Sequence, residues 1–439
     1  MTEPYRPPLL IVADSPDALV DLCGISLLER MRRIALQLGF REAMILCNSV
    51  KAVTTHLANE SWRRADVSLT FRERMGAKVT VGDILDCLDA LRAAPDDRIL
   101  ILFAGFYCDE RLLRALADAQ TNSGLIDSDP PSIIAPLLEN SDFHSSRLLC
   151  AALLSSEWLL RKIRDGTLAE EITSDMIAGR IARVDAARQQ AYVGGMRRNV
   201  RPVFFPAPSR ERRSLAERLL LDATQKGVLD FPALVHAPIE KWLVSHLCRT
   251  SITPNQITLG TGVLGLGVTL LYAGGYLWAG VSLALVIGVL DGVDGKLARL
   301  KAQTTKLGKK EHDLDYFIET SWWVALAYHF HATGQISYAY LIFGAFFAFD
   351  RLERAAKKAV QRRIGRNLDD FAPFDRLVRM VAGRRNVYTW LFTFFLVIGA
   401  PATGFIWLCC WGMTSAVIHI VRALQIGFAG QDRVPSTPS

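Results

Sequence analysis

Cysteine pairs and a secretory leader are both missing from this 439-residue sequence. Its eight cysteines show no C-x-x-C pair and no regular spacing, which argues against a disulfide framework or a cysteine-ligated zinc site. Free, mostly buried thiols in a reducing compartment are expected instead. The opening stretch MTEPYRPPLLIVADSPDALV has no basic segment followed by a hydrophobic segment and a cleavage site. We therefore expect no secretory signal and a cytosolic N-terminal half.

Charge is missing from one long stretch, because residues 250–290 contain no Asp, Glu, Lys or Arg. A helix of that length would run about 60 Å, enough to cross a bilayer core of about 30 Å twice. Gly274 and Gly275 lie near the middle, where a turn is expected. Together with the later apolar runs, this pattern predicts six transmembrane helices, at about 255–273, 277–299, 314–333, 336–352, 387–401 and 403–424.

The basic residues between these runs gather on one side of the predicted membrane. They follow residue 299 and fill a basic connection, residues 351–385, whereas the opposite turns carry almost no charge. The positive-inside rule then places both termini, the basic connection and the site described below on the cytoplasmic face of the inner (plasma) membrane. The net charge of +7 is assigned to contacts with anionic membrane lipids, and no nucleic-acid partner is expected.

The N-terminal half has a different pattern, in which short apolar runs alternate with helical periodicity. Buried parallel strands are predicted at 9–13, 43–47 and 98–104, with helices at 25–39 and 81–94 between them. The whole chain is therefore divided into an α/β domain, a helical linker, an all-α polytopic membrane domain and a disordered tail, at 1–205, 206–235, 236–428 and 429–439.

Acidic residues return at the mouth of the second predicted span. Asp291, Asp294, Gly295 and Ala298 are spaced i, i+3, i+4 and i+7, which places them on one helical face. Two carboxylates one turn apart can bind a hard divalent cation, and the glycine leaves room for a phosphate ligand. Arg299 is suited to a phosphate oxygen.

A second acidic face is predicted at the start of the third span, where Asp315 and Glu319 are spaced i, i+4. We call Asp291, Asp294, Asp315 and Glu319 the acidic quartet. Carboxylates near hydrocarbon are costly and would repel one another, so cations are expected among them. A pair of Mg²⁺ ions that bridges a pyrophosphate would meet this need.

The first of these acidic faces resembles the signature of the CDP-alcohol phosphotransferase (phosphatidyltransferase) superfamily, D-x2-D-G-x2-A-R-x8-G-x3-D-x3-D. The first part of the signature is present in full, as Asp291, Asp294, Gly295, Ala298, Arg299 and Gly308. The stretch TPNQIT, residues 253–258, also resembles the start of the family's first span and makes Asn255 and Thr258 candidates for the nucleotide side of the site. The resemblance covers about residues 236–425.

The second half of the signature departs from the pattern. Direct spacing from Gly308 leads to His312 and Tyr316, neither of which is an aspartate. An insertion of three residues would instead place Asp315 and Glu319 in these positions, and we prefer it because a tyrosine is not a base at neutral pH without a large pKa shift. His312 and Asp313 stay open as a metal ligand or base.

The resemblance implies an activity and a set of roles. The family transfers a phosphoalcohol group from a CDP-alcohol donor to an acceptor hydroxyl and releases CMP, with Mg²⁺ or Mn²⁺, in phospholipid or polyol-phosphate biosynthesis. By resemblance, the acidic quartet would hold two metal ions, with Asp315 and Glu319 also catalytic and Glu319 accepting the acceptor's proton. Gly295, Ala298, Arg299 and Gly308 would border the nucleotide, and a homodimer is expected.

The basic connection has two open interpretations. It either anchors the protein to lipid, which we favour, or recognises a phosphate on the acceptor. In the second case Arg384 and Arg385 are the best candidates.

The N-terminal half resembles nucleotidyltransferase folds more weakly. Residues 23–49 resemble the region after the glycine-rich loop of sugar-nucleotide and cytidylyltransferases, and residues 96–113 resemble their metal-site strand. The combination resembles fused inositol-phosphate cytidylyltransferase and di-inositol phosphate phosphate synthase chains. Residues 9–23 lack the G-x-G-x-R loop, however, and Gly105 stands near the expected metal aspartate, with Asp109 displaced. A degenerate, noncatalytic domain is predicted.

Two other classes stay open beside the transferase. Acidic pairs inside spans also mark ion pathways, so a cation transporter is an alternative. A catalytically inactive membrane scaffold is another, because of His312 and Tyr316 at the direct spacing.

Overall fold

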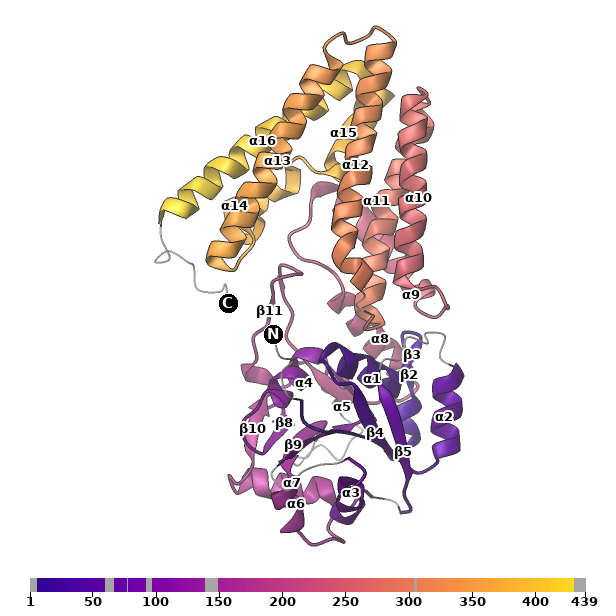
Figure 1. The fold of residues 1–439 in the computed structure, drawn as a ribbon, viewed down its shortest axis with the longest axis vertical. Helices are drawn as coiled ribbons and strands as arrows, with labels where there is room; N and C mark the ends of the chain where they lie inside the picture. Colours follow the sequence, from indigo (N-terminus) through magenta and orange to yellow (C-terminus); the bar gives the residue numbers. More distant parts are fainter. Residues whose placement is uncertain are drawn as a thin grey trace.

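The computed structural model describes residues 6–59, 67–76, 78–91, 97–138, 149–303 and 306–429. Two parts follow one another along the chain: an α/β part that ends with strand β13, and a helical part from α8 to α16 (Figure 1). The α/β part is built on a seven-stranded sheet, whose strands in spatial order are β10 (Ala182–Asp185), β8 (Ser123–Ile126), β9 (Ala151–Ser155), β6 (Arg98–Phe103), β1 (Leu9–Ala13), β4 (Glu42–Cys47) and β5 (Ser68–Glu73).

The three predicted strands are confirmed as β1, β4 and β6, at the centre of this sheet. Leu10 pairs with Met44 on one side and Ile101 on the other, both in parallel register. Such strands are covered on both faces, which explains why they read as continuous apolar runs. Strand β9 runs antiparallel to β6 and β8, which the sequence pattern did not indicate.

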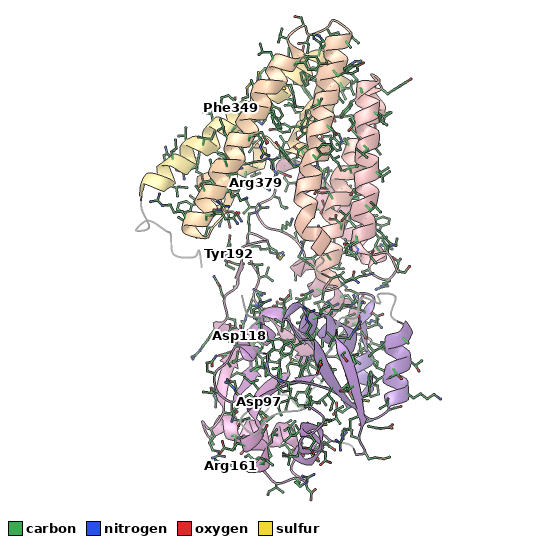
Figure 2. The ribbon with its side chains drawn as sticks, viewed as in Figure 1. Asp97, Asp118, Arg161, Tyr192, Phe349 and Arg379 are labelled. Carbon is green, nitrogen blue, oxygen red and sulfur yellow. The ribbon has the colours of Figure 1, made fainter. Side chains whose placement is uncertain are left out.

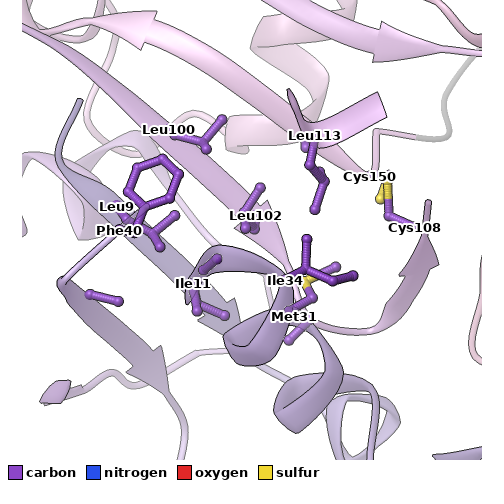
Figure 3. Close-up of a cluster of buried hydrophobic side chains, with 14 of the residues drawn as sticks. Leu9, Ile11, Met31, Ile34, Phe40, Leu100, Leu102, Cys108, Leu113 and Cys150 are labelled. Carbon is purple, nitrogen blue, oxygen red and sulfur yellow. The ribbon is translucent and has the colours of Figure 1, made fainter. Parts of the chain in front are cut away.

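Helices and short strands complete the α/β part. The helices are α1 (Leu27–Gln37), α2 (Val50–Asn59), α3 (Val81–Leu88), α4 (Glu110–Ala117), α5 (Ala135–Leu138), α6 (Ser156–Leu160) and α7 (Leu168–Ile177). The short strands are β2 (Asp21–Leu22), β3 (Ile25–Ser26), β7 (Phe106–Cys108), β11 (Tyr192–Val193), β12 (Arg198–Asn199) and β13 (Phe204–Pro206). Met31 and Ile34 of α1 pack on Leu9 and Ile11 of β1 in a buried cluster (Figure 3). All eight cysteines are free, and seven of them are buried.

The helical part contains α8 (Arg213–Ala223), α9 (Phe231–Leu247), α10 (Pro254–Ala273), α11 (Leu277–Leu300), α12 (Lys306–Ala332), α13 (Ala339–Ile364), α14 (Pro373–Val381), α15 (Arg385–Val397) and α16 (Pro401–Ala429), with a short 3-10 turn η3 (Leu368–Asp370) before α14. Helix α10 begins with a capping box, in which Thr253 and Gln256 bond each other's backbone N–H. Pro254 occupies its first position, where a missing N–H costs nothing.

Three helices of the described residues are long and apolar enough to cross a membrane: Pro254–Ala273, Leu277–Leu300 and Pro401–Gly427. They coincide with three of the predicted spans, at 255–273, 277–299 and 403–424. The other three predicted spans exist as α12, α13 and α15 but do not meet this standard. Helix α15 has only 13 residues, and α13 continues past the predicted end at 352 through charged residues to Ile364. Six spans therefore stay a prediction.

Helix α1 of the α/β part caps the C-terminal end of α11, which is the end predicted to face the cytoplasm. The last carbonyls of a helix have no partner inside it and favour cationic donors. Three side chains of α1 donate to carbonyls at this end of α11 and just after it: Arg30 to Leu300 O at 2.5 Å, Arg33 to Lys301 O at 2.9 Å and Gln37 to Ala302 O at 2.8 Å. A shared apolar cluster, with Leu22 and Leu27 against Val293 and Leu297, lies beside this cap. The two parts are thus joined directly below the predicted motif.

Candidate functional site

A cavity of about 640 Å³ opens among α11, α12, α13 and α15. Its lining includes eight of the predicted site residues: Asp291, Asp294, Gly295, Arg299, Asp315, Glu319, Arg384 and Arg385. Among the described residues, the lining holds eight acidic and eight basic side chains, so its formal charge is close to zero. The acidic quartet, which the sequence assigned to two different helices, therefore faces one space.

Asp291 is paired with a residue from the distant end of the helical part. The guanidinium Nη2 of Arg385, the first residue of α15, lies 2.7 Å from Asp291 Oδ2. The charges of Glu319 and Asp315 also act on Arg385, which is 14% exposed. Arg385 therefore serves as a cation among three members of the quartet, a contact that neither interpretation of the basic connection had included.

Asp294 is buried, and its carboxylate is oriented by α10. The hydroxyl of Thr258 donates a hydrogen bond of 2.8 Å to Asp294 Oδ2. This contact brings the predicted Thr258 next to the motif, although neither it nor Asn255 nor Ala298 lines the cavity. Helix α9 packs closely on α11 at position 292, next to Asp291, and this packing explains the glycine there. A Cβ at Gly292 would lie 2.2 Å from Glu240 Cδ.

The second acidic face lies on α12 and turns toward the same cavity. Asp315 and Glu319 both line it and are half-buried. Tyr316 also lines it, but its hydroxyl donates to Asp350 Oδ2 at 2.9 Å, and the Arg354 guanidinium lies over its ring at 4.2 Å. Gly308, His312 and Asp313 fall in the first turns of α12, where the side chains lie outside the described residues.

The donor set of the acidic quartet suits Mg²⁺ or Mn²⁺, because hard divalent cations prefer carboxylate oxygens. The arrangement is not a finished metal site, however. No three Asp, Glu, His or Cys side chains in the described part of the chain are close enough together to hold an ion. Arg385 and Thr258 instead satisfy Asp291 and Asp294. The residues fit the ion by chemistry, and Arg385 stands in as the cation of this arrangement.

A buried ion network extends the cavity toward α14 and α16, and sequence reasoning missed it. Asp369 lies 2.6 Å from Arg379 and 3.0 Å from Lys357. Lys357 also lies 2.7 Å from Glu353, which contacts His419 at 3.0 Å. Burial would raise the pKa of Asp369, but Lys357 and Arg379 outweigh burial and hold that pKa below its usual range. The acidic pair at 369–370 inside a basic stretch was the available signal.

The remaining cations of the cavity come from different segments. Arg384 lies 3.7 Å from Asp230. Arg299 of the matched motif donates from Nε to Thr224 O at 3.0 Å. Arg197 and Lys226, which precede all the predicted spans, also line the cavity and were not predicted as site residues.

The match to known proteins falls on this site. Residues 251–315 match the family described as CDP-alcohol phosphatidyltransferase, which confirms the resemblance inferred from the D-x2-D-G-x2-A-R motif. One curated relative, the bifunctional IPC transferase and DIPP synthase of Thermococcus kodakarensis, is 34% identical over 117 residues. That segment is 26% of this chain and 26% of the relative. The chain therefore spans about a quarter of the length of the curated relative it matches.

Two solved structures each match about half of this chain. A Mycobacterium tuberculosis phosphatidylinositol phosphate synthase with CDP-DAG bound is 16% identical, with a TM-score of 0.34 over 47% of this chain and 100% of that one. HddC from Yersinia pseudotuberculosis is 13% identical, with a TM-score of 0.33 over 48% of this chain and 98% of that one. At these TM-scores the likenesses carry no argument about this chain.

Proposed function

We propose that this chain is a membrane-embedded transferase that moves a phosphoalcohol group from a CDP-alcohol to an acceptor hydroxyl and releases CMP. The observation that carries the proposal is the convergence of the acidic quartet on one cavity, within and beside the segment that matches the family. A site for in-line displacement at phosphorus needs cations and positioned anionic ligands, which is the chemistry of this lining.

The proposed roles follow the family resemblance, and the lining of the cavity supports them. Asp291, Asp294 and Asp315 would hold two Mg²⁺ or Mn²⁺ ions, with Glu319 as a further ligand or as the base for the acceptor hydroxyl. The ions would neutralise the charge that develops on the diphosphate. Thr258 orients the Asp294 carboxylate, and Gly295 leaves the helix surface open, because a Cβ there would meet only the Arg299 guanidinium, at 3.4 Å.

The proposal includes the setting of the reaction. Three apolar helices and the family match support a membrane protein. We infer an inner-membrane, multi-pass protein with its site and termini on the cytoplasmic face, supported by the Lys and Arg distribution. Membrane lipids and a second copy of the chain are the proposed partners, and products would enter phospholipid or polyol-phosphate biosynthesis.

The α/β part is proposed to have no catalytic role of its own. Asp109, the residue nearest to the expected metal aspartate, caps α4 and lies 2.9 Å from the Arg111 guanidinium. Both of its carboxylate oxygens are thus engaged in local structure. Purified chain should not form a CDP-alcohol from CTP and a polyol phosphate; CTP-dependent product would overturn this part of the proposal.

The transferase proposal is tested by CMP release from the full chain in detergent. A panel of lipid and polyol CDP-alcohols, each with several hydroxyl acceptors, is assayed with Mg²⁺ and with a chelator. We expect release from at least one pair with Mg²⁺ only, and its loss in Asp291→Asn. The matched control is Asp129→Asn, whose side chain is 88% exposed in the α/β part. Metal flux into proteoliposomes without CMP release would favour the transporter instead.

A further inference from the structure

A hairpin of the α/β part reaches into the helical part (Figure 1). Strands β11 and β12 pair between Tyr192 and Asn199. The Tyr192 hydroxyl donates to Asp370 Oδ2 at 2.5 Å, and the Asn367 amide donates to Gly194 O at 3.3 Å. Figure 2 labels Tyr192 on the hairpin and Arg379 on α14, the helix that follows η3. The hairpin is therefore held against η3, at the edge of the cavity.

The linker before α9 crosses the hairpin at very close range. The Gly227 N–H donates to Met196 O at 2.8 Å, and a Cβ at Gly227 would lie 2.4 Å from Arg197 O. Two non-glycine residues beside this crossing, Arg197 and Val228, have positive φ values of 50° and 48°. Such conformations cost about 1–3 kcal/mol each and persist where the surrounding structure imposes them. The crossing fixes Arg197 and Lys226 side by side.

Three cations meet at this crossing, and none of them forms a short ion pair with a carboxylate of the described residues. Arg299 donates to a backbone carbonyl, and Arg197 has only a 3.8 Å contact with Asp369, which Arg379 and Lys357 already neutralise. The buried Nε of Arg197 has no hydrogen-bond partner in the part of the chain that the structure describes. No described residue forms a salt bridge or side-chain hydrogen bond with the Lys226 ammonium, whose side chain is exposed where it lines the cavity.

The electrostatics of Lys226 agree with this geometry. Although the Lys226 side chain is exposed to the cavity, the protein atoms around it still lower its pKa by desolvation. The Arg299 guanidinium lowers this pKa further, whereas Asp291 and Asp294 act against both. Like charges gathered in one place repel, and an anion between them would remove the repulsion. The trio is thus a positive end of a cavity whose other described lining residues include eight acidic and five basic side chains.

We infer that Arg197 and Lys226, together with Arg299, bind a phosphate group of the substrate. Two of the three cations lie outside the predicted spans, so the membrane site is completed by the hairpin and the linker. The inference deepens the proposed transferase function and rests on it for the identity of the substrate. The phosphate belongs either to the donor's diphosphate or to a phosphorylated acceptor, which share this chemistry.

Binding of inorganic pyrophosphate and inorganic phosphate to the full chain in detergent tests the inference without turnover. Lys226→Gln and Arg197→Gln should each weaken pyrophosphate binding by about tenfold or more in calorimetric titration, since each removes a charge-assisted contact. Lys226→Arg should keep most of the affinity. The matched control is Arg188→Gln, a charge loss in the α/β part at a side chain that is 87% exposed, and its affinity should equal that of the wild type.

Turnover then identifies the source of the phosphate. A higher KM for the CDP-alcohol in Lys226→Gln assigns the trio to the donor, and a higher KM for the acceptor assigns it to the acceptor; either supports the inference. Unchanged pyrophosphate and phosphate affinity in both glutamine variants overturns it, as does an equal loss in Arg188→Gln. If no CDP-alcohol is turned over, the proposed function fails, whereas the binding comparison still decides the anion site.

Discussion

The guanidinium of Arg385 lies 2.7 Å from a carboxylate oxygen of Asp291, and this contact joins α15 to the first residue of the matched motif on α11. The pair explains how the members of the acidic quartet can face one cavity, because an internal cation offsets part of their mutual repulsion. The pair also implies that a divalent ion and Arg385 would compete for the same carboxylates.

Removing this internal cation should make stability depend on metal. Arg385→Gln leaves the quartet uncompensated, and breaking such a partly buried pair costs about 3 kcal/mol. We expect a lower thermal unfolding midpoint in a chelator and recovery of most of the loss with Mg²⁺. Arg384→Gln is the control for stability, since its contact with Asp230 is 3.7 Å long. If the thermal unfolding midpoint of Arg385→Gln is the same with and without Mg²⁺, metal binding by the acidic quartet is contradicted.

The shifted alignment of the second acidic face predicts unequal effects for two neighbours on α12. Glu319→Gln should lower CMP release by about 100-fold or more, because it removes a general base or metal ligand. Tyr316→Phe should change release only a few-fold, since its hydroxyl is engaged by Asp350. The measurement is kcat for each variant at saturating donor and Mg²⁺. The reverse order of the two effects would favour the direct spacing.

The hydrogen bond from Thr258 to Asp294 predicts a role for α10 in metal binding. Partners that orient a metal ligand typically contribute about 10- to 100-fold in affinity or activity. Thr258→Val should therefore raise the Mg²⁺ concentration for half-maximal CMP release by about tenfold. Thr269→Val is the control, on the same helix, where the hydroxyl bonds Ser321 at 2.7 Å and lies outside the cavity lining. Equal Mg²⁺ dependence in the two variants would remove Thr258 from the site.

Acid should weaken the α/β part through Asp175. This buried carboxylate accepts from the Trp158 indole at 2.7 Å and pairs with Lys162 and Arg180. Although burial raises the pKa of Asp175, these partners lower it to about 2, from 3.8. The depressed pKa adds stability above pH 3.8, which is lost as pH falls through about 2. Tryptophan fluorescence unfolding of Asp175→Asn should lack this acid-dependent loss; a wild-type pH profile would contradict the assignment.

Local pattern was enough for the parts of the structure that depend on neighbours in sequence. The apolar run at 9–13 became β1 because both sheet faces are covered, and Thr253 and Pro254 began α10 by capping rules. The motif spacing placed Asp291 and Asp294 on one helical face. Each of these depends on a few adjacent residues.

Contacts between distant segments could not be predicted in the same way. The meeting of Arg385 with Asp291 depends on how α15 packs against α11, and no periodicity reports that packing. The positions of Arg197 and Lys226 depend on a crossing at Gly227, which a single sequence shows only as one more glycine. The continuation of α13 to Ile364 was not predicted either, because the contact of Lys357 with Glu353 inside the ion network depends on packing against distant segments.

The cap that α1 places on α11 leads to a last prediction, about coupling between the two parts. Arg30 donates to Leu300 O at 2.5 Å and to Leu22 O at 3.0 Å, so it links the end of the motif helix to the α/β part. Arg30→Met keeps much of the volume but removes both bonds, at a cost of about 1–3 kcal/mol. Because unpaired terminal carbonyls let a helix fray, amide hydrogen exchange at 296–302 should accelerate.

The same variant should weaken pyrophosphate binding, although Arg30 does not line the cavity. Fraying at Leu300 shifts Arg299 and the turn that carries Asp294, so pyrophosphate binding should fall severalfold while exchange in β1 and β4 stays at wild-type rates. Arg188→Met, at an exposed position far from the cap, serves as the matched control. Faster exchange across the whole α/β part would mean general destabilisation, and unchanged exchange at 296–302 would mean that Arg30 does not hold the end of α11.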